Sequence, residues 1–146
     1  MARYDVTAIG SKLTLISALF PAGFVVSEGS DDVALWDVSC TPFGETTVGL
    51  NCDQIDNKSP SVYTITIGVI PNSRSDRNLK KMVAMNRAQG TNVTTDIIQG
   101  ILVEPSGDKQ MFPNLNMTEG ALANTPNPNG RFQTRTYVFK GVNQIF

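Results

Sequence analysis

The chain has 146 residues and a formal net charge of −1, and its residues are 40% hydrophobic and 17% charged. These values predict one globular domain over residues 1–146, because a chain of this length buries about two thirds of its unfolded surface without a metal or a disulfide. No apolar run approaches the roughly 20 residues that span a bilayer, and no secretory signal pattern is present, so we expect a protein made in the cytoplasm without a membrane anchor.

The first half of the chain shows short strand patterns separated by proline and glycine. The expected strands cover residues 6–8, 12–16, 24–26, 32–40 and 45–52. The segment "DQIDNKSPS", which begins at Asp53, is rich in turn formers and is predicted to be a connection without a strand.

The segment from Ser61 to Ile70 has the clearest strand pattern. Tyr63, Ile65, Ile67 and Val69 alternate with polar residues, so they are expected to face the core. The alternating set on the opposite face includes Thr64 and Thr66.

A helix is predicted over about 75–89. Ser73 or Ser75 is suited to cap its start, Asp76 lies near its positive end, and Gly90 follows its expected end. Leu79, Met82, Val83 and Asn86 recur at helical spacing and form the face expected to pack on the sheet.

Two strands are predicted around the turn Pro105–Asp108, within "DIIQGILVEPSGDKQMFPN". The segment "LNMTEGALANTPNPNG" is predicted to be a long connection. The last strand, "RFQTRTYVFK", alternates cleanly, but its core face is either that of Phe132 and Val138 or that of Tyr137 and Phe139. One helix among many strands predicts a mainly β fold, a β-sandwich or small barrel with one flanking helix.

The strand–loop–helix order around "PNSRSDRN" also occurs in nucleotide-binding sites. A phosphate-binding loop needs glycines that let backbone N–H groups approach the anion, and this loop has none. The segment is therefore expected to serve the architecture of the fold.

The sequence contains no histidine, which removes Ser-His-Asp and Cys-His catalysis and the usual near-neutral general base. An enzyme would depend on carboxylates or lysine, and we rank that reading last. We expect no catalytic residues, cofactor or metal site. Cys40 and Cys52 are expected to be buried free thiols, and a disulfide between them stays the alternative.

Charge is unevenly distributed along the chain. Seven acidic residues and no lysine or arginine occur from Glu28 to Asp56, whereas the predicted helix region is basic. Either these are two solvated surfaces, or the acidic segment of one copy meets the basic helix of the next and sets the register of assembly. The second hypothesis names as interface residues Glu45, Asp53, Asp56, Arg74, Arg77, Lys80 and Lys81.

The order of "SPSVYTITIGVIPNSRSDRNLKKMVAMNRAQG", "DIIQGILVEPSGDK" and "GRFQTRTYVFK" resembles that of tail tube proteins of contractile-tailed bacteriophages. The resemblance implies hexameric rings that stack into a hollow virion tail tube, assembled in the host cytoplasm. It implies an extended loop at about 41–59 that reaches a neighbouring subunit, with sheath, baseplate and tail terminator proteins as partners. DNA would pass through the channel without specific binding, and Thr64 and Thr66 are the candidate channel-facing residues.

A second hypothesis from another class is a small β-sandwich binding module, or an accessory module of the baseplate or tail. A binding module would stay monomeric or form one small closed oligomer, whereas a tube protein would form rings or polymers. The oligomeric state therefore distinguishes the two hypotheses.

Overall fold

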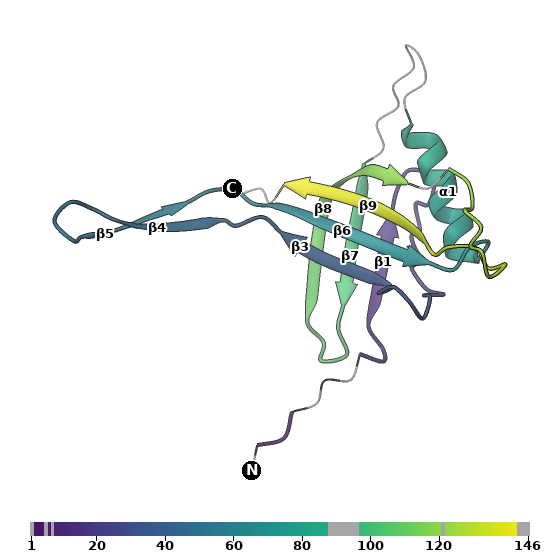
Figure 1. Ribbon diagram of the computed structural model, residues 1–146, viewed down its shortest axis with the longest axis horizontal. Coiled ribbons are helices and arrows are strands. Elements are labelled where there is room, and N and C mark those ends of the chain that lie inside the picture. Colours follow the sequence, from purple (N-terminus) through teal and green to yellow (C-terminus); the bar gives the residue numbers. More distant parts are fainter. Residues whose placement is uncertain (1, 5, 7, 88–96, 121, 143–146) are drawn as a thin grey trace.

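The computed structural model describes residues 2–4, 6, 8–87, 97–120 and 122–142. Figure 1 shows a compact β body with one helix at one end and a long hairpin that projects from the other. The nine strands and the helix described are β1 Lys12–Ile16, β2 Phe24–Val25, β3 Trp36–Cys40, β4 Gly44–Val48, β5 Gln54–Lys58, β6 Val62–Val69, α1 Arg74–Asn86, β7 Ile98–Val103, β8 Lys109–Gly120 and β9 Arg135–Val142.

Seven strands form one antiparallel sheet in the order β2-β1-β7-β8-β9-β6-β3. The long strand β8 pairs with β7 through its first half and with β9 through its second half. Register shifts interrupt both pairings, and such bulges bend a strand. The sheet therefore folds over itself into two layers that cross, and the predicted sandwich-like class is confirmed, in an unclosed form (Figure 1).

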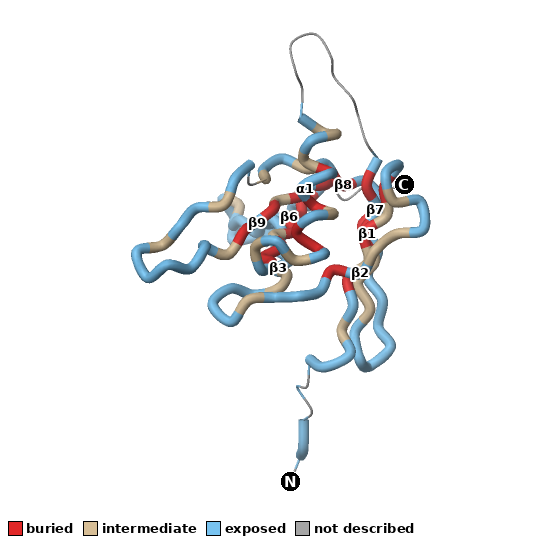
Figure 2. The backbone as a smooth tube through the Cα atoms, turned by 90° about the vertical axis from the view of Figure 1, so that its right-hand side faces the viewer, coloured by how far each residue is buried: buried red, intermediate tan, exposed pale blue. Residues whose placement is uncertain are grey.

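The core lies between these two layers and beneath the helix (Figure 2). The alternation read in the sequence holds, because the side chains of Tyr63, Ile65, Ile67 and Val69 are all buried. In β9 the buried face is that of Tyr137 and Phe139, which settles the choice left open above. The other core members are Leu13, Leu15, Val26, Leu79, Met82, Ile98, Phe112 and Leu115.

Helix α1 is capped as its sequence predicts. The Ser73 hydroxyl accepts a hydrogen bond from the Asp76 backbone N–H at 3.2 Å. Leu79 and Met82 are fully buried, and a Cβ added at Gly120 of β8 would overlap the side chain of Val83. The helix therefore lies very close to β8. It ends at Asn86, earlier than expected, and the predicted stop at Gly90 lies outside the described residues.

Several sequence-based boundaries are wrong. The expected strands 32–40 and 45–52 are shorter, as β3 and β4, and the last strand begins at Arg135 and not at Arg131. Residues 54–58 form β5, although the segment looked like a turn-rich connection, because its backbone pairs with β4 in five residue pairs. The segment Leu115–Gly120, expected to be part of a long connection, belongs to β8. Val6 and Ala8 are not in a strand, and Thr7 between them lies outside the described residues.

Candidate assembly surfaces

The hairpin β4–β5, called the arm below (residues 44–58), extends the β3–β6 pair beyond the sandwich. Backbone hydrogen bonds from Thr41 to Val62 and from Ser59 to Phe43 connect the two pairs. No residue of the arm is buried. Where the sequence-based interpretation expected an extended loop at about 41–59, residues 44–58 form a two-stranded hairpin that stands clear of the body (Figure 1), and its contact with a neighbouring subunit stays a prediction.

The end of the arm carries uncovered apolar side chains on both of its faces. The exposed fractions are 73% for Val48, 106% for Leu50 and 53% for Ile55. The register pairs Val48 with Gln54 and Thr47 with Ile55, so Val48 and Ile55 lie on opposite faces. The arm end would therefore be covered by a surface that encloses it from two sides.

Of the predicted acidic interface residues, Asp53 and Asp56 lie toward this end of the arm, and Glu45 lies near its root. Asp56 accepts hydrogen bonds from Gln54 Nε2 at 3.0 Å and from Thr46 Oγ1 at 2.9 Å. Both hydrogen bonds lower the pKa of Asp56, and the bond from Gln54 is the larger cause. Asp53 lies in the turn and Glu45 near the root. The arm thus presents carboxylates beside apolar side chains.

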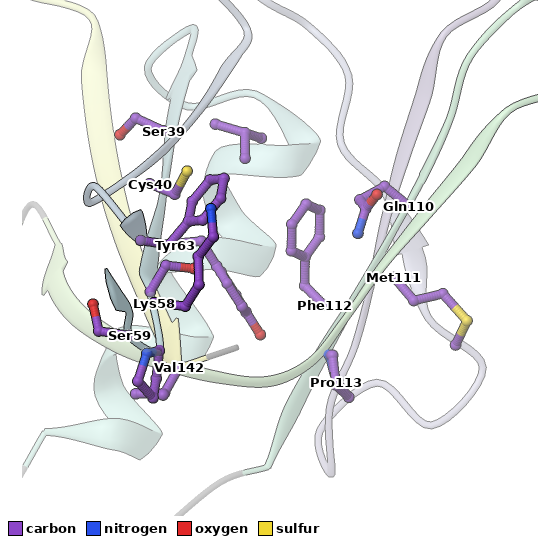
Figure 3. A pocket seen from close by; sticks show the side chains of 14 residues that line it. Ser39, Cys40, Lys58, Ser59, Tyr63, Gln110, Met111, Phe112, Pro113 and Val142 are labelled. Atoms are coloured by element: carbon purple, nitrogen blue, oxygen red, sulfur yellow. The ribbon is translucent and has the colours of Figure 1, made fainter. Parts of the chain in front are cut away.

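A groove of about 760 Å³ opens at the root of the arm, between the β3–β6 edge and the first half of β8. We call it the basal groove. Tyr63 and Phe112 face each other across the layers with their ring centroids 5.1 Å apart (Figure 3). The described lining residues are Val38, Ser39, Cys40, Phe43, Lys58, Ser59, Pro60, Ser61, Tyr63, Gln110, Met111, Phe112, Pro113 and Val142.

Thr64 and Thr66 lie on the outer face of β6, away from the core. Thr64 is paired with Ser39 and Lys140, and Thr66 with Asp37. Thr66 is also paired with Val138, and Val62 with Val142, so this face carries charges of both signs together with apolar side chains. Its composition is compatible with contact to water along a channel, the role expected for the two threonines.

The predicted basic residues Arg74, Arg77, Lys80 and Lys81 are all exposed on α1. Figure 1 places α1 and the arm at opposite ends of the molecule, so the basic helix and the acidic arm do not meet within one chain. Contact between them in different copies stays a prediction.

The other acidic residues near the helix have partners in their own chain. Glu28 accepts a hydrogen bond from the Arg74 backbone N–H at 2.7 Å, and Asp31 forms an ion pair with Arg131 at 2.9 Å. Hydrogen bonding to Arg131 lowers the pKa of Asp31. The acidic residues from Glu28 to Asp56 therefore belong to two separate regions, a loop beside α1 and the arm, with Asp37 on β3.

One buried cluster was missed in the sequence. Asp76 and Arg135 are 1% and 4% exposed, and Arg135 Nε lies 3.3 Å from Asp76 Oδ1. The Tyr137 hydroxyl donates a hydrogen bond to the same oxygen at 2.7 Å. A signal existed, because Asp76 shares the helix face of Leu79, and Arg135 shares the strand face of Tyr137 and Phe139.

The chemistry of the remaining sites is sparse. The described residues contain no group of three or more Cys, Asp or Glu side chains arranged to hold a metal. Both cysteines are unpaired, but both are exposed, so the expectation that they are buried is wrong. No helix among the described residues has the length and apolar character required to cross a membrane.

The fold and its surfaces describe a β protein whose most prominent feature is an uncovered hairpin suited to contact with another chain. Residues 4–143 match the model of a protein family described as tail fiber protein gp32, and the chain belongs to this family. It is thus a structural protein of a phage virion tail, which confirms the coarser part of the sequence-based interpretation. No curated protein matches the chain.

Proposed function

We propose that the chain is a self-assembling subunit of the tail tube, forming hexameric rings that stack into a hollow conduit for phage DNA. The observation that carries this proposal is the arm. A two-stranded hairpin alone in water is marginally stable, and one with an apolar end is covered in the functional state. In an assembly of identical subunits, the arm of each subunit would be covered by its neighbours.

The sheet gives a second line of support. Among the described residues, the sheet ends at β3 on one side and at β2 on the other, so it does not close. Edge strands present unpaired backbone groups that invite pairing with another chain. A ring of subunits joined at such edges would place the sheet face with Thr64 and Thr66 along a channel. DNA would pass there without specific binding.

The second candidate function is an accessory or fibre component of the tail. The description of the family as a tail fiber protein favours it. In that case the basal groove would serve as a binding site, and the protein would form a small closed oligomer. Sheath, baseplate and tail terminator proteins are proposed partners of the tube subunit, whereas a fibre component would contact the baseplate.

Electron microscopy of the purified protein, combined with sedimentation velocity, tests the proposal. Rings or tubes with a central hole are expected, at a subunit stoichiometry of six. Monomers, or solid elongated particles without a hole, would overturn the tube function and favour the accessory role.

A further inference from the structure

The apolar end of the arm is not covered by the part of its own chain that the structure describes. Phe43 and Lys58 lie at the root, where they line the basal groove. Val48 is five residues beyond Phe43, and strands rise about 3.3 Å per residue, so the arm end lies roughly 15 Å farther out. The arm runs outward from the body (Figure 1). Its apolar side chains therefore need a surface on another molecule.

The basal groove has the shape and chemistry that such an end requires. It is walled by side chains from both layers, with Cys40 and Tyr63 on one side and Phe112 on the other (Figure 3). Phe43 is 55% exposed and Val38 is 37% exposed, so the groove is itself uncovered in the single chain. A two-sided groove matches an arm end that is apolar on both faces.

The charges are also complementary. Among the described lining residues Lys58 is the one charged side chain, and its ammonium group lies 5.7 Å from the Phe43 ring centroid. The incoming end carries Asp53 in its turn and Asp56 close behind it. A cation at the mouth of an apolar groove favours an apolar segment with carboxylates at its edge.

We propose that the basal groove of one copy receives the arm end, residues 48–55, of a second copy, with Cys52 of the incoming arm beside Cys40 of the groove. The inference rests on the proposed self-assembly and names its contact. Arm and groove are different surfaces, so the contact is heterologous. Repeated from copy to copy, it closes into a ring or continues as a stack.

The two natural cysteines provide the test. Cys40 lines the groove and Cys52 lies in the turn of the arm, 12 residues away along an extended chain. A disulfide requires Cα atoms within about 7 Å, so a bond between them within one chain is excluded by this geometry. Assembled protein is treated with a short bismaleimide and analysed on denaturing gels. We expect a ladder of covalent oligomers joined through Cys40–Cys52 peptides.

Serine variants make the result specific. Cys40→Ser alone and Cys52→Ser alone should give no ladder, whereas their mixture, assembled together, should give covalent dimers. Cross-linking of either single variant would show that like cysteines meet, and absence of the dimer in the mixture would overturn the proposal.

Two surface substitutions test the fit. Leu50→Asp on the arm and Phe43→Asp in the groove should each reduce cross-linking at least about tenfold with unchanged circular dichroism, whereas Leu122→Asp, at a position elsewhere that is exposed to nearly the same degree as Phe43, should not. Unchanged cross-linking in the first two would overturn the docking. Rings or tubes without Cys40–Cys52 cross-links would refute the docking alone, and a cross-linked closed dimer would refute the tube alone.

Discussion

Arg135 of β9 and Asp76 of α1 form a buried ion pair, with Nε and Oδ1 3.3 Å apart. The carboxylate also accepts hydrogen bonds from the Tyr137 hydroxyl and from the Asn72 backbone N–H. Arg135 Nη1 donates to Asn124 Oδ1 at 3.0 Å. The cluster thus joins the start of the helix to the sheet and to the loop before β9. Such a group fixes the orientation of the helix, because alternative packings leave its charges unpaired.

Asp76→Ala should destabilise the chain by about 3–5 kcal/mol, because it leaves Arg135 buried without its carboxylate. Urea unfolding followed by circular dichroism measures the loss. Asp53→Ala, at an exposed position in the arm, is the control and should change the free energy of unfolding by less than about 0.5 kcal/mol. Similar losses in both variants would contradict an energetic role for the cluster.

Tyr137 makes the stability of the fold sensitive to alkaline pH. Burial, followed by the hydrogen bond to Asp76, raises the pKa of Tyr137 above its usual 10.0. The folded chain keeps this proton at pH values at which the unfolded chain has lost it. The contribution of Tyr137 to the free energy of unfolding is therefore complete below pH 10, and it declines as the pH rises beyond 10.

Tyr137→Phe removes this proton and should cost about 1.5–3 kcal/mol near neutral pH, where the hydrogen bond to a carboxylate is lost. The advantage of the wild type in urea unfolding should be constant up to about pH 9 and should shrink as the pH rises through about 10 to 11. Burial raises the pKa of Tyr63 in the same direction, but that contribution is common to both proteins. A constant difference across the pH range would refute the assignment to Tyr137.

Leu79 holds the helix on the sheet through a fully buried side chain. Leu79→Ala should reduce the free energy of unfolding by about 2–5 kcal/mol. Leu79→Asp should abolish soluble folded protein, since it places a carboxyl group in an apolar site. Lys81→Ala, on the exposed side of the same helix, serves as the control. Wild-type thermal stability in Leu79→Asp would show that the packing is incidental.

Much of the fold could be predicted from the sequence, because apolar residues recur along a strand or helix with the spacing that places them on its buried face. The alternation of β6, the match of β1 to Lys12–Ile16 and the stripe of Leu79 and Met82 all reflect contact with one core. Strand β5 gave no such signal, because its residues are all exposed and only backbone pairing with β4 defines it. Periodicity cannot detect a strand that buries nothing.

The surfaces were harder to predict than the core. The extended segment at 41–59 was expected from the resemblance, but its hairpin form and its apolar end depend on the register of two strands. The basal groove combines residues from β3, β6 and β8, which no local pattern places together. Asp76 was read as a helix-cap charge, and its burial depends on a strand some 60 residues later in the chain.

The arm should be dispensable for folding and required for polymerisation. Deleting Glu45 to Asp56 removes residues that bury nothing in the single chain, so the free energy of unfolding should change little. Sedimentation velocity should then show a folded monomer where the wild type forms large species. A replacement of the same segment by a short glycine–serine turn provides a second variant. Normal tubes from either variant would exclude an assembly role for the arm.

Contact between the basic helix of one copy and the acidic arm of another is the alternative to docking in the basal groove, and it would set the register of assembly through opposite charges. If the basic helix of one copy meets the acidic arm of another, Lys80→Glu combined with Lys81→Glu places like charges together. Both lysines are exposed, and exposed pairs contribute only about 0–1 kcal/mol each, so folding should barely change. A ring repeats the contact at every interface, and stacking repeats it again, so small repulsions add across the assembly.

The double variant should therefore assemble poorly at low salt and recover partly as the Debye length falls to about 3 Å near 1 M. Sedimentation of the wild type and the variant across a salt series measures this dependence. Lys12→Glu combined with Lys109→Glu reverses two exposed lysines at the starts of β1 and β8, away from α1, and so controls for the same change in net charge. Equal assembly of the double variant and the wild type at every salt concentration would mean that both charged regions are solvated surface, and that apolar contacts of the arm alone set the register.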